Sequence, residues 1–132
     1  MTTVLFACVH NAGRSQMAAA LFNQIANPDK ARAISAGTDP GPRVHPEVLT
    51  VMAERGVDLT HAIPVRLTGD LAQQAQWLIT MGCGDQCPFV PGARTEDWPL
   101  DDPKGRPIDQ VRGIRDDIAQ RVGAFVDAHG WR

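Results

Sequence analysis

The sequence predicts an α/β fold in which helices cover a single parallel sheet. Short apolar runs alternate along the chain with segments of helical periodicity, and this alternation is typical of parallel sheets. Residues 2–7 are almost continuously apolar, as expected for a strand that is buried on both faces. The chain has 132 residues, of which 43% are hydrophobic, so we expect one domain with one core over residues 1–132.

The other elements follow from periodicity and from breaker residues. Helices are expected at residues 15–26, 45–55, 70–74 and 108–129, where apolar residues recur at helical spacing. Strands are expected at residues 31–35, 77–81 and 94–98, and Pro99 makes the last of these an edge strand. The buried face of the helix at 45–55 is predicted to comprise Val48, Leu49, Met52 and Ala53.

The most informative stretch follows the first strand and reads Cys8-Val-His-Asn-Ala-Gly-Arg14-Ser15. Asn11 and Gly13 tolerate unusual backbone angles, so this loop can turn successive N–H groups toward an anion. The next helix adds its positive end, and Arg14 adds a planar fork for two oxygens. That positive field favours the thiolate of Cys8, to which Ser15 can donate a hydrogen bond. The pattern predicts a thiolate nucleophile aimed at a tetrahedral oxyanion; the alternative is a buried, unreactive cysteine.

Three further groups are expected near this loop, at the carboxyl ends of the strands where ligands bind. His10 lies in the loop and is a candidate for contacting the anion, although we favour a position in which it faces solvent or packs on a neighbour. Ser35 closes the second strand. In Asp101-Asp102-Pro103, proline restricts Asp102, so a carboxyl group there can act as a general acid. The same tripeptide is also a common turn.

Cys83 and Cys87 form a second constellation after the third strand. Residues four apart on one helical turn lie ~6 Å apart, which is within disulfide range, so a relay with Cys8 is conceivable. A zinc site is an alternative, but one cysteine pair supplies two ligands and the four histidines show no paired spacing. In the remaining alternative both cysteines only pack.

Composition excludes several classes of function. The net charge is −2 with mixed charges, which gives no reason to expect a nucleic-acid or membrane partner. The early apolar run, residues 4–9, is too short for a signal peptide and lacks a basic flank, and no segment is long enough to span a bilayer. We therefore expect a cytoplasmic protein, whose three cysteines are reactive thiols or metal ligands instead of structural disulfides.

The segment Cys8–Ser15 resembles the phosphate loop of the low-molecular-weight protein tyrosine phosphatase family. The resemblance continues through residues 35–37, 80–88 and 98–103, and the cysteine pair followed by Trp and Asp-Asp-Pro resembles the family's arsenate reductase branch. It implies a three-layer sandwich with a four-stranded parallel sheet of order 2-1-3-4. It also implies that Asp102, and not Asp101, is the general acid.

The resemblance implies that the chain reduces arsenate to arsenite without a metal or bound cofactor. Cys8 would attack arsenate held by the loop, and Cys83 and Cys87 would pass the resulting disulfide to thioredoxin. The close spacing of these two cysteines is similar to that of actinobacterial members, which implies a second route through mycothiol and mycoredoxin.

Two other functions stay open. The same loop serves phosphomonoester and tyrosine phosphatases, but the chain has no tyrosine, and Lys104 follows Pro103 where similar phosphatases carry tyrosines that grip an aromatic substrate. A sensor that binds an oxyanion or arsenite through its thiols is the third hypothesis, for which no DNA-binding helix-turn-helix is recognisable.

Overall fold

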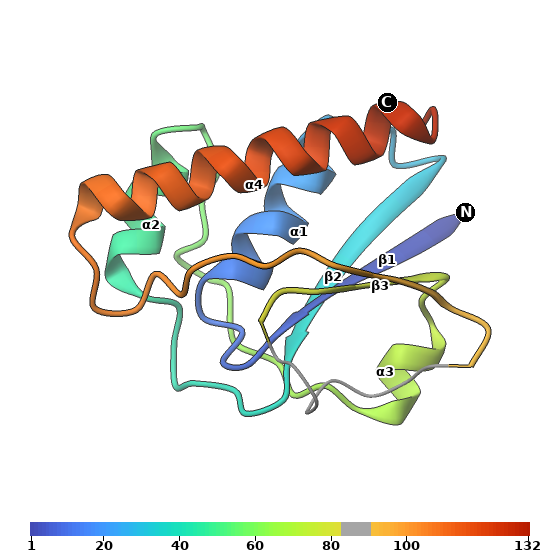
Figure 1. The fold of residues 1–132 in the computed structure, drawn as a ribbon, viewed down its shortest axis with the longest axis horizontal. Coiled ribbons are helices and arrows are strands. Elements are labelled where there is room, and N and C mark those ends of the chain that lie inside the picture. Colours follow the sequence, from blue (N-terminus) through green and yellow to red (C-terminus); the bar gives the residue numbers. More distant parts are fainter. Residues whose placement is uncertain (83–90) are drawn as a thin grey trace.

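The computed structural model describes residues 1–82 and 91–132, which form a sheet between two layers of helices (Figure 1). The strands are β1 (Thr2–Cys8), β2 (Ala31–Gly37), β3 (Trp77–Thr80) and β4 (Arg94–Asp97). All neighbouring strands are parallel, in the order β2-β1-β3-β4. The predicted α/β class, the three layers and the strand order are confirmed.

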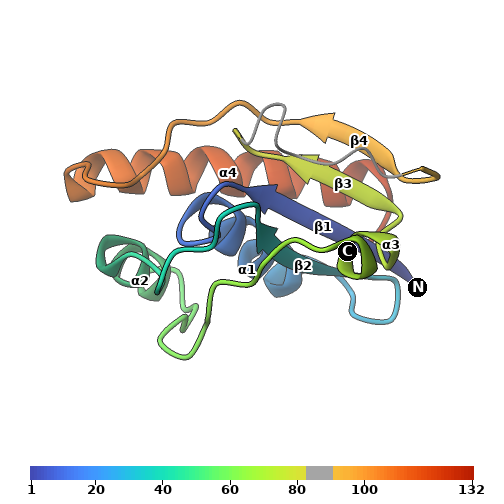
Figure 2. The ribbon, with the colours of Figure 1, turned by 90° about the horizontal axis from the view of Figure 1, so that it is seen from below.

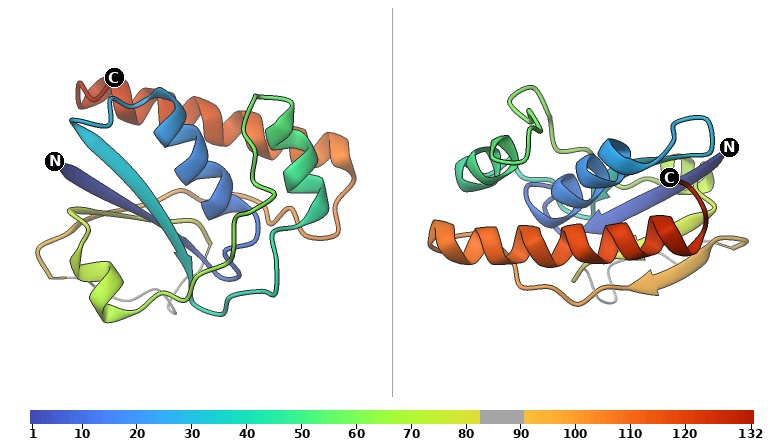
Figure 3. Two further views of the ribbon diagram at one scale, coloured as in Figure 1. Left: turned by 180° about the vertical axis from the view of Figure 1, so that it is seen from behind. Right: turned by 90° about the horizontal axis from the view of Figure 1, so that it is seen from above.

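Helices cover the sheet unequally. The helices are α1 (Arg14–Ile25), α2 (Pro46–Ala53), α3 (Gly69–Gln73) and α4 (Ile108–Ala128). α1, α2 and α4 lie on one side of the sheet and α3 lies on the other, as the views in Figures 1 and 2 agree. In the right-hand view of Figure 3, the long helix α4 runs along the front of the molecule with α1 beside it.

Strand β1 is the centre of both cores. Val4, Phe6 and Cys8 belong to the large cluster shared with α1, α2 and α4, whereas Leu5 and Ala7 belong to the small cluster shared with α3. This division follows from the alternation of side chains along a strand. All five side chains are at most 2% exposed, which confirms the prediction of a strand buried on both faces.

Two details of the prediction are wrong. On α2 the buried residues are Val48, Val51 and Met52, whereas Ala53 is exposed. Ala53 is five positions after Val48, which places it about 140° further around the helix, away from α4. Ser35 does not lie at the carboxyl end of β2 either. It pairs with Phe6, two residues before the aligned carboxyl ends, Cys8 and Gly37.

The strand register brings four chain segments to one edge of the sheet. Cys8 is aligned with Gly37, Ala7 with Thr80, and Thr80 with Asp97, so the segments that follow these strands start side by side. A ligand site is therefore expected where the carboxyl ends of the strands meet.

Within the described ranges, no helix combines the length and the apolar character needed to cross a membrane.

Candidate oxyanion site

A buried thiol lies at the end of β1 and contacts the first turn of α1. Cys8 is 2% exposed, and its Sγ lies 2.9 Å from the Oγ of Ser15. The Ser15 Oγ also accepts a hydrogen bond of 2.7 Å from the Nδ2 of Asn11. Because one lone pair of Ser15 is occupied by Asn11, its hydroxyl hydrogen is available for the sulfur. This arrangement stabilises negative charge on Cys8.

The loop between Cys8 and α1 turns its carbonyl groups outward. The carbonyl oxygens of residues 8, 9, 10 and 12 accept hydrogen bonds of 2.8 to 3.1 Å from N–H groups in the segment 38–45. No backbone N–H from residues 10–15 has an acceptor in the part of the chain that the structure describes. Unpaired N–H groups at a helix N-terminus form a ready site for an anion. The loop therefore has the shape and polarity of an oxyanion cup.

Asn11 holds this loop in shape. It is the only described non-glycine residue with positive φ, at 49°, and it is fully buried. Its Nδ2 donates to Ser15, while its Oδ1 accepts from the Nε2 of Gln16 at 3.1 Å and from the N–H of Val65 at 2.9 Å. These three bonds commit the side chain of Asn11 to the protein, so only its backbone N–H is available to an anion. Gln16 was not singled out by sequence reasoning.

Gly13 has the unusual backbone angles that were predicted for this loop, with φ −146° and ψ −89°, which are neither helical nor extended. The structure shows a second reason for glycine at this position. A Cβ at this position would lie 2.6 Å from the Cγ of Pro103, which is closer than real Cβ contacts allow. Glycine therefore lets the Asp101-Asp102-Pro103 segment pack directly against the loop.

Arg14 connects the loop to two other strand ends. Its side chain is 8% exposed, and its Nη1 donates a 3.1 Å hydrogen bond to the carbonyl of Leu100. Its Nη2 lies 3.8 Å from the Oδ2 of Asp102. On another side, Gly82 approaches so closely that an added Cβ would collide with the Nη1 of Arg14. Nothing in the local sequence around Gly82 or Leu100 indicates these contacts.

The side chain of Asp102 lies near Arg14, whereas that of Asp101 does not line the same site. The Oδ1 of Asp102 accepts from the N–H of Lys104 at 3.0 Å, and its carbonyl accepts from the Nε of Arg106 at 2.8 Å. These bonds hold the carboxyl group, whose side chain is 44% exposed. Asp101 is exposed and lines a different cavity, beside α4.

His10 and His45 lie on the outer side of the loop. The Nδ1 of His10 is 3.0 Å from the carbonyl oxygen of Asp39, so this ring contacts the neighbouring segment. The backbone N–H of His45 donates to the carbonyl of Ala12. Burial lowers the pKa of the His45 imidazole, while the charges of Asp102 and Glu47 act in the opposite direction. Nothing in the sequence around His45 indicates that it lies beside this loop.

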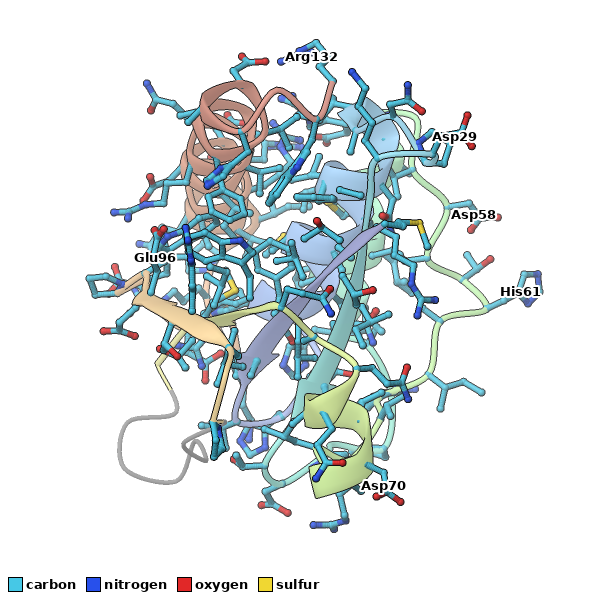
Figure 4. The ribbon with its side chains drawn as sticks, turned by 90° about the vertical axis from the view of Figure 1, so that its right-hand side faces the viewer. Asp29, Asp58, His61, Asp70, Glu96 and Arg132 are labelled. Atoms are coloured by element: carbon cyan, nitrogen blue, oxygen red, sulfur yellow. The ribbon has the colours of Figure 1, made fainter. Side chains whose placement is uncertain are left out.

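The predicted cysteine relay depends on Cys83 and Cys87, which lie outside the described residues. Among residues 1–82 and 91–132, no group of three His, Cys, Asp or Glu side chains could hold a metal ion. His61 is on the connector between α2 and α3 and points away from the sheet, as Figure 4 shows.

Fold and site together define a class of protein: a parallel α/β sandwich that presents a cysteine thiol within an anion-binding loop. The sequence matches the low molecular weight phosphotyrosine protein phosphatase family over residues 3–129, and the chain belongs to this family. The family resemblance inferred from the motifs is thereby confirmed.

Similar proteins include reductases and a phosphatase. A protein of Halobacterium salinarum described as a putative arsenate reductase is 40% identical over 126 residues, which cover 92% of this chain and 89% of that protein. A thioredoxin-dependent arsenate reductase of Corynebacterium glutamicum is 39% identical, with a TM-score of 0.83 over 97% of this chain. This chain spans 61% of the length of that protein. An arginine phosphatase of Geobacillus stearothermophilus has a TM-score of 0.83 over 98% of this chain and 94% of its own, and at 23% identity it supports the fold alone.

Proposed function

We propose that this protein is an arsenate reductase that uses Cys8 as its nucleophile. The observation that carries the proposal is the buried Cys8 thiol, hydrogen-bonded to Ser15 inside a loop whose N–H groups have no acceptor among the described residues. Relatives named as arsenate reductases, the first at 40% identity, favour arsenate among the tetrahedral oxyanions that fit such a loop. A cytoplasmic location fits this function, because the cytoplasm keeps thiols such as that of Cys8 reduced.

In the first step the loop binds arsenate and Cys8 attacks it. The backbone N–H groups of His10, Asn11 and Gly13 belong to the unpaired set, and the guanidinium of Arg14 neutralises charge on the oxyanion. The thiolate of Cys8 forms a bond to arsenic, and an oxygen of arsenate leaves as water. Asp102, held near Arg14, donates the proton that this oxygen needs.

In the second step two electrons pass from sulfur to arsenic. The thiolate of Cys83 attacks the sulfur of Cys8, so an S–S bond forms while the S–As bond breaks. The electron pair of that bond stays on arsenic, which leaves as arsenite. Cys87 then attacks Cys83, and the Cys83–Cys87 disulfide is reduced by thioredoxin. The name of the 39% identical Corynebacterium protein supports thioredoxin as partner. A mycothiol–mycoredoxin route is the alternative, and neither route needs a bound cofactor.

A second candidate function is hydrolysis of phosphomonoesters at the same loop. Membership in a phosphatase family favours it. The absence of tyrosine from the whole chain argues against an aromatic substrate, because Lys104 follows Pro103 where similar phosphatases carry the tyrosines that grip such a substrate. We expect slow hydrolysis of simple esters, with Cys8 as the nucleophile.

The test is arsenate turnover coupled to NADPH consumption, with thioredoxin and with mycothiol–mycoredoxin in parallel. Hydrolysis of para-nitrophenyl phosphate is measured on the same protein. Cys8→Ser is expected to abolish both activities. Cys83→Ser and Cys87→Ser are expected to abolish turnover with thioredoxin while they leave ester hydrolysis intact. Fast ester hydrolysis without arsenate turnover in either system would refute the proposal.

A further inference from the structure

Gln16 is a buried polar side chain that no step of the proposed reaction uses. It lies in the first turn of α1 and is 8% exposed. Its Nε2 donates a hydrogen bond of 3.1 Å to the Oδ1 of Asn11 and one of 3.4 Å to the carbonyl oxygen of Ile63. A buried amide is tolerated when its hydrogen bonds are made, and these two bonds connect Gln16 to the oxyanion loop.

The amide of Asn11 has one favoured orientation, because a backbone group identifies the end that carries its oxygen. The N–H of Val65 can only donate, and it lies 2.9 Å from the Oδ1 of Asn11. The Nδ2 of Asn11 consequently points at the Oγ of Ser15, at 2.7 Å. Gln16 places a second donor on the same oxygen, so it strengthens the preference for this orientation.

The segment that carries Val65 is itself fixed to the end of β2. The carbonyl of Val65 accepts a hydrogen bond of 2.8 Å from the N–H of Gly37, the last residue of that strand. This segment reaches the first turn of α1 where Ile63 accepts from Gln16, and it reaches the loop where Val65 donates to Asn11. The donors that surround the oxygen of Asn11 are therefore held in place by two different elements.

The orientation of the Asn11 amide decides what the hydroxyl of Ser15 can do. Because Asn11 donates to the Oγ of Ser15, the hydroxyl hydrogen is free to point at the Sγ of Cys8, 2.9 Å away. In the reversed orientation the oxygen of Asn11 would face Ser15 and accept that hydrogen, and the sulfur would lose it. Asn11 and Ser15 are fully buried, so solvent cannot supply the missing donor.

We propose that Gln16 is a positioning residue that directs the hydroxyl hydrogen of Ser15 toward the sulfur of Cys8. It acts through Asn11, whose oxygen it holds away from Ser15. Three hydrogen bonds in series, from Gln16 to Asn11, from Asn11 to Ser15 and from Ser15 to Cys8, carry this effect. The inference rests on the proposed role of Cys8 as the nucleophile, and it holds for any oxyanion that the thiolate attacks.

The test measures how readily the thiolate of Cys8 forms, from the rate of alkylation by iodoacetamide over a range of pH. All proteins in the test carry Cys83→Ser and Cys87→Ser, so that Cys8 is the only thiol of the chain. Gln16→Met removes the donor with little change in side-chain volume. Gln24→Met is the matched control, because Gln24 lies on the same helix and donates its amide to the carbonyl of Arg55.

Gln16→Met is expected to slow alkylation at about pH 7 by about threefold to tenfold, the size of one lost hydrogen bond, and to move the pH profile to higher pH. Gln24→Met is expected to leave the profile unchanged. The decisive comparison repeats Gln16→Met in a Ser15→Ala background. Without a hydroxyl to direct, the substitution is expected to have no further effect, whereas a general loosening of the loop would slow alkylation in both backgrounds.

A second variant, Gln16→Glu, keeps the length and polarity of the side chain but presents a carboxylate to the Oδ1 of Asn11. Its added charge acts on Cys8 with or without the hydroxyl of Ser15, so the comparison between the two backgrounds cancels the effect of the charge. Gln16→Glu is expected to show the same dependence on Ser15 as Gln16→Met. Urea unfolding of each variant measures its stability and verifies that it folds.

Unchanged alkylation in the Gln16 variants, or an equal slowing with and without the hydroxyl of Ser15, would overturn the inference. Both results would leave the proposed function intact, because that function depends on arsenate turnover by the unmodified protein. Absence of this turnover with every thiol system would instead refute the proposed function. The alkylation test needs no arsenate, so it would still decide the role of Gln16.

Discussion

Replacing Gly82 with alanine is expected to weaken oxyanion binding through a residue that touches no oxyanion. Gly82 has φ = 94°, and a Cβ there would collide with the Nη1 of Arg14 and lie 3.2 Å from its Cζ. The guanidinium must then move away from its hydrogen bond to the Leu100 carbonyl. A guanidinium displaced in this way also loses its charge-assisted contact with a bound oxyanion, and the loss of one such hydrogen bond costs about 1.5–3 kcal/mol, or about 10- to 150-fold in affinity.

A positive φ also destabilises the fold when alanine replaces glycine, by about 1–2 kcal/mol. Gly92 provides the matched control, because its φ is 85° but no atom of the described residues lies within 4 Å of an added Cβ. Gly92→Ala therefore shares the backbone cost without the collision with Arg14. Urea unfolding is expected to show a loss of free energy in both variants, with an additional loss in Gly82→Ala from the broken hydrogen bond between Arg14 and Leu100.

The assay is calorimetric titration of each variant with inorganic phosphate and with arsenate. Gly82→Ala is expected to bind both anions at least about 10-fold more weakly than Gly92→Ala. Equal affinities in the two variants, at equal stability, would show that Gly82 does not position Arg14. The close approach of Gly82 to Arg14 would then have no bearing on binding.

Two further predictions concern the loop and its outer wall. Ser15→Ala removes the hydroxyl near Cys8, so kcat/KM for arsenate is expected to fall about 10- to 100-fold, with slower alkylation of Cys8 by iodoacetamide at fixed pH; unchanged alkylation would contradict the predicted stabilisation of the thiolate. Burial lowers the pKa of His45 from its usual 6.5, so the unfolded chain binds more protons and stability falls as the pH falls below that value. His45→Asn is expected to reduce the difference in unfolding free energy between about pH 7.5 and about pH 5.5, and an unchanged difference would refute this linkage.

Local patterns were sufficient for most elements of this fold. The helix expected at 15–26 occupies Arg14–Ile25, and the strand expected at 94–98 occupies Arg94–Asp97. The exception on α2 arose because Val51 and Ala53 lie on opposite sides of Val48 around the helix, and only the tertiary packing decides on which side the buried stripe continues. Apolar periodicity predicts that one side of a helix is buried, but it does not say where the helices and strands that cover this side lie.

The oxyanion loop was the part of the site that the sequence determined by itself. Its parts lie within eight consecutive residues, Cys8–Ser15, so chain connectivity alone keeps the thiol, the N–H groups and the helix end together. The family resemblance extends beyond this loop to residues 35–37, 80–88 and 98–103, which is why it was enough to predict the fold and the strand order.

Only the tertiary structure decided what surrounds that loop. Arg14 meets the carbonyl of Leu100 across 86 positions of sequence, and Asn11 receives the N–H of Val65 across 54. Gly82 and His45 also approach the loop from distant parts of the chain. Such contacts depend on which strand ends lie side by side, and the parallel order β2-β1-β3-β4 sets this. A local sequence pattern carries no information about a contact with a residue from a distant segment. The contacts of Leu100, Val65, Gly82 and His45 with the loop could therefore be recognised only from the paired strands.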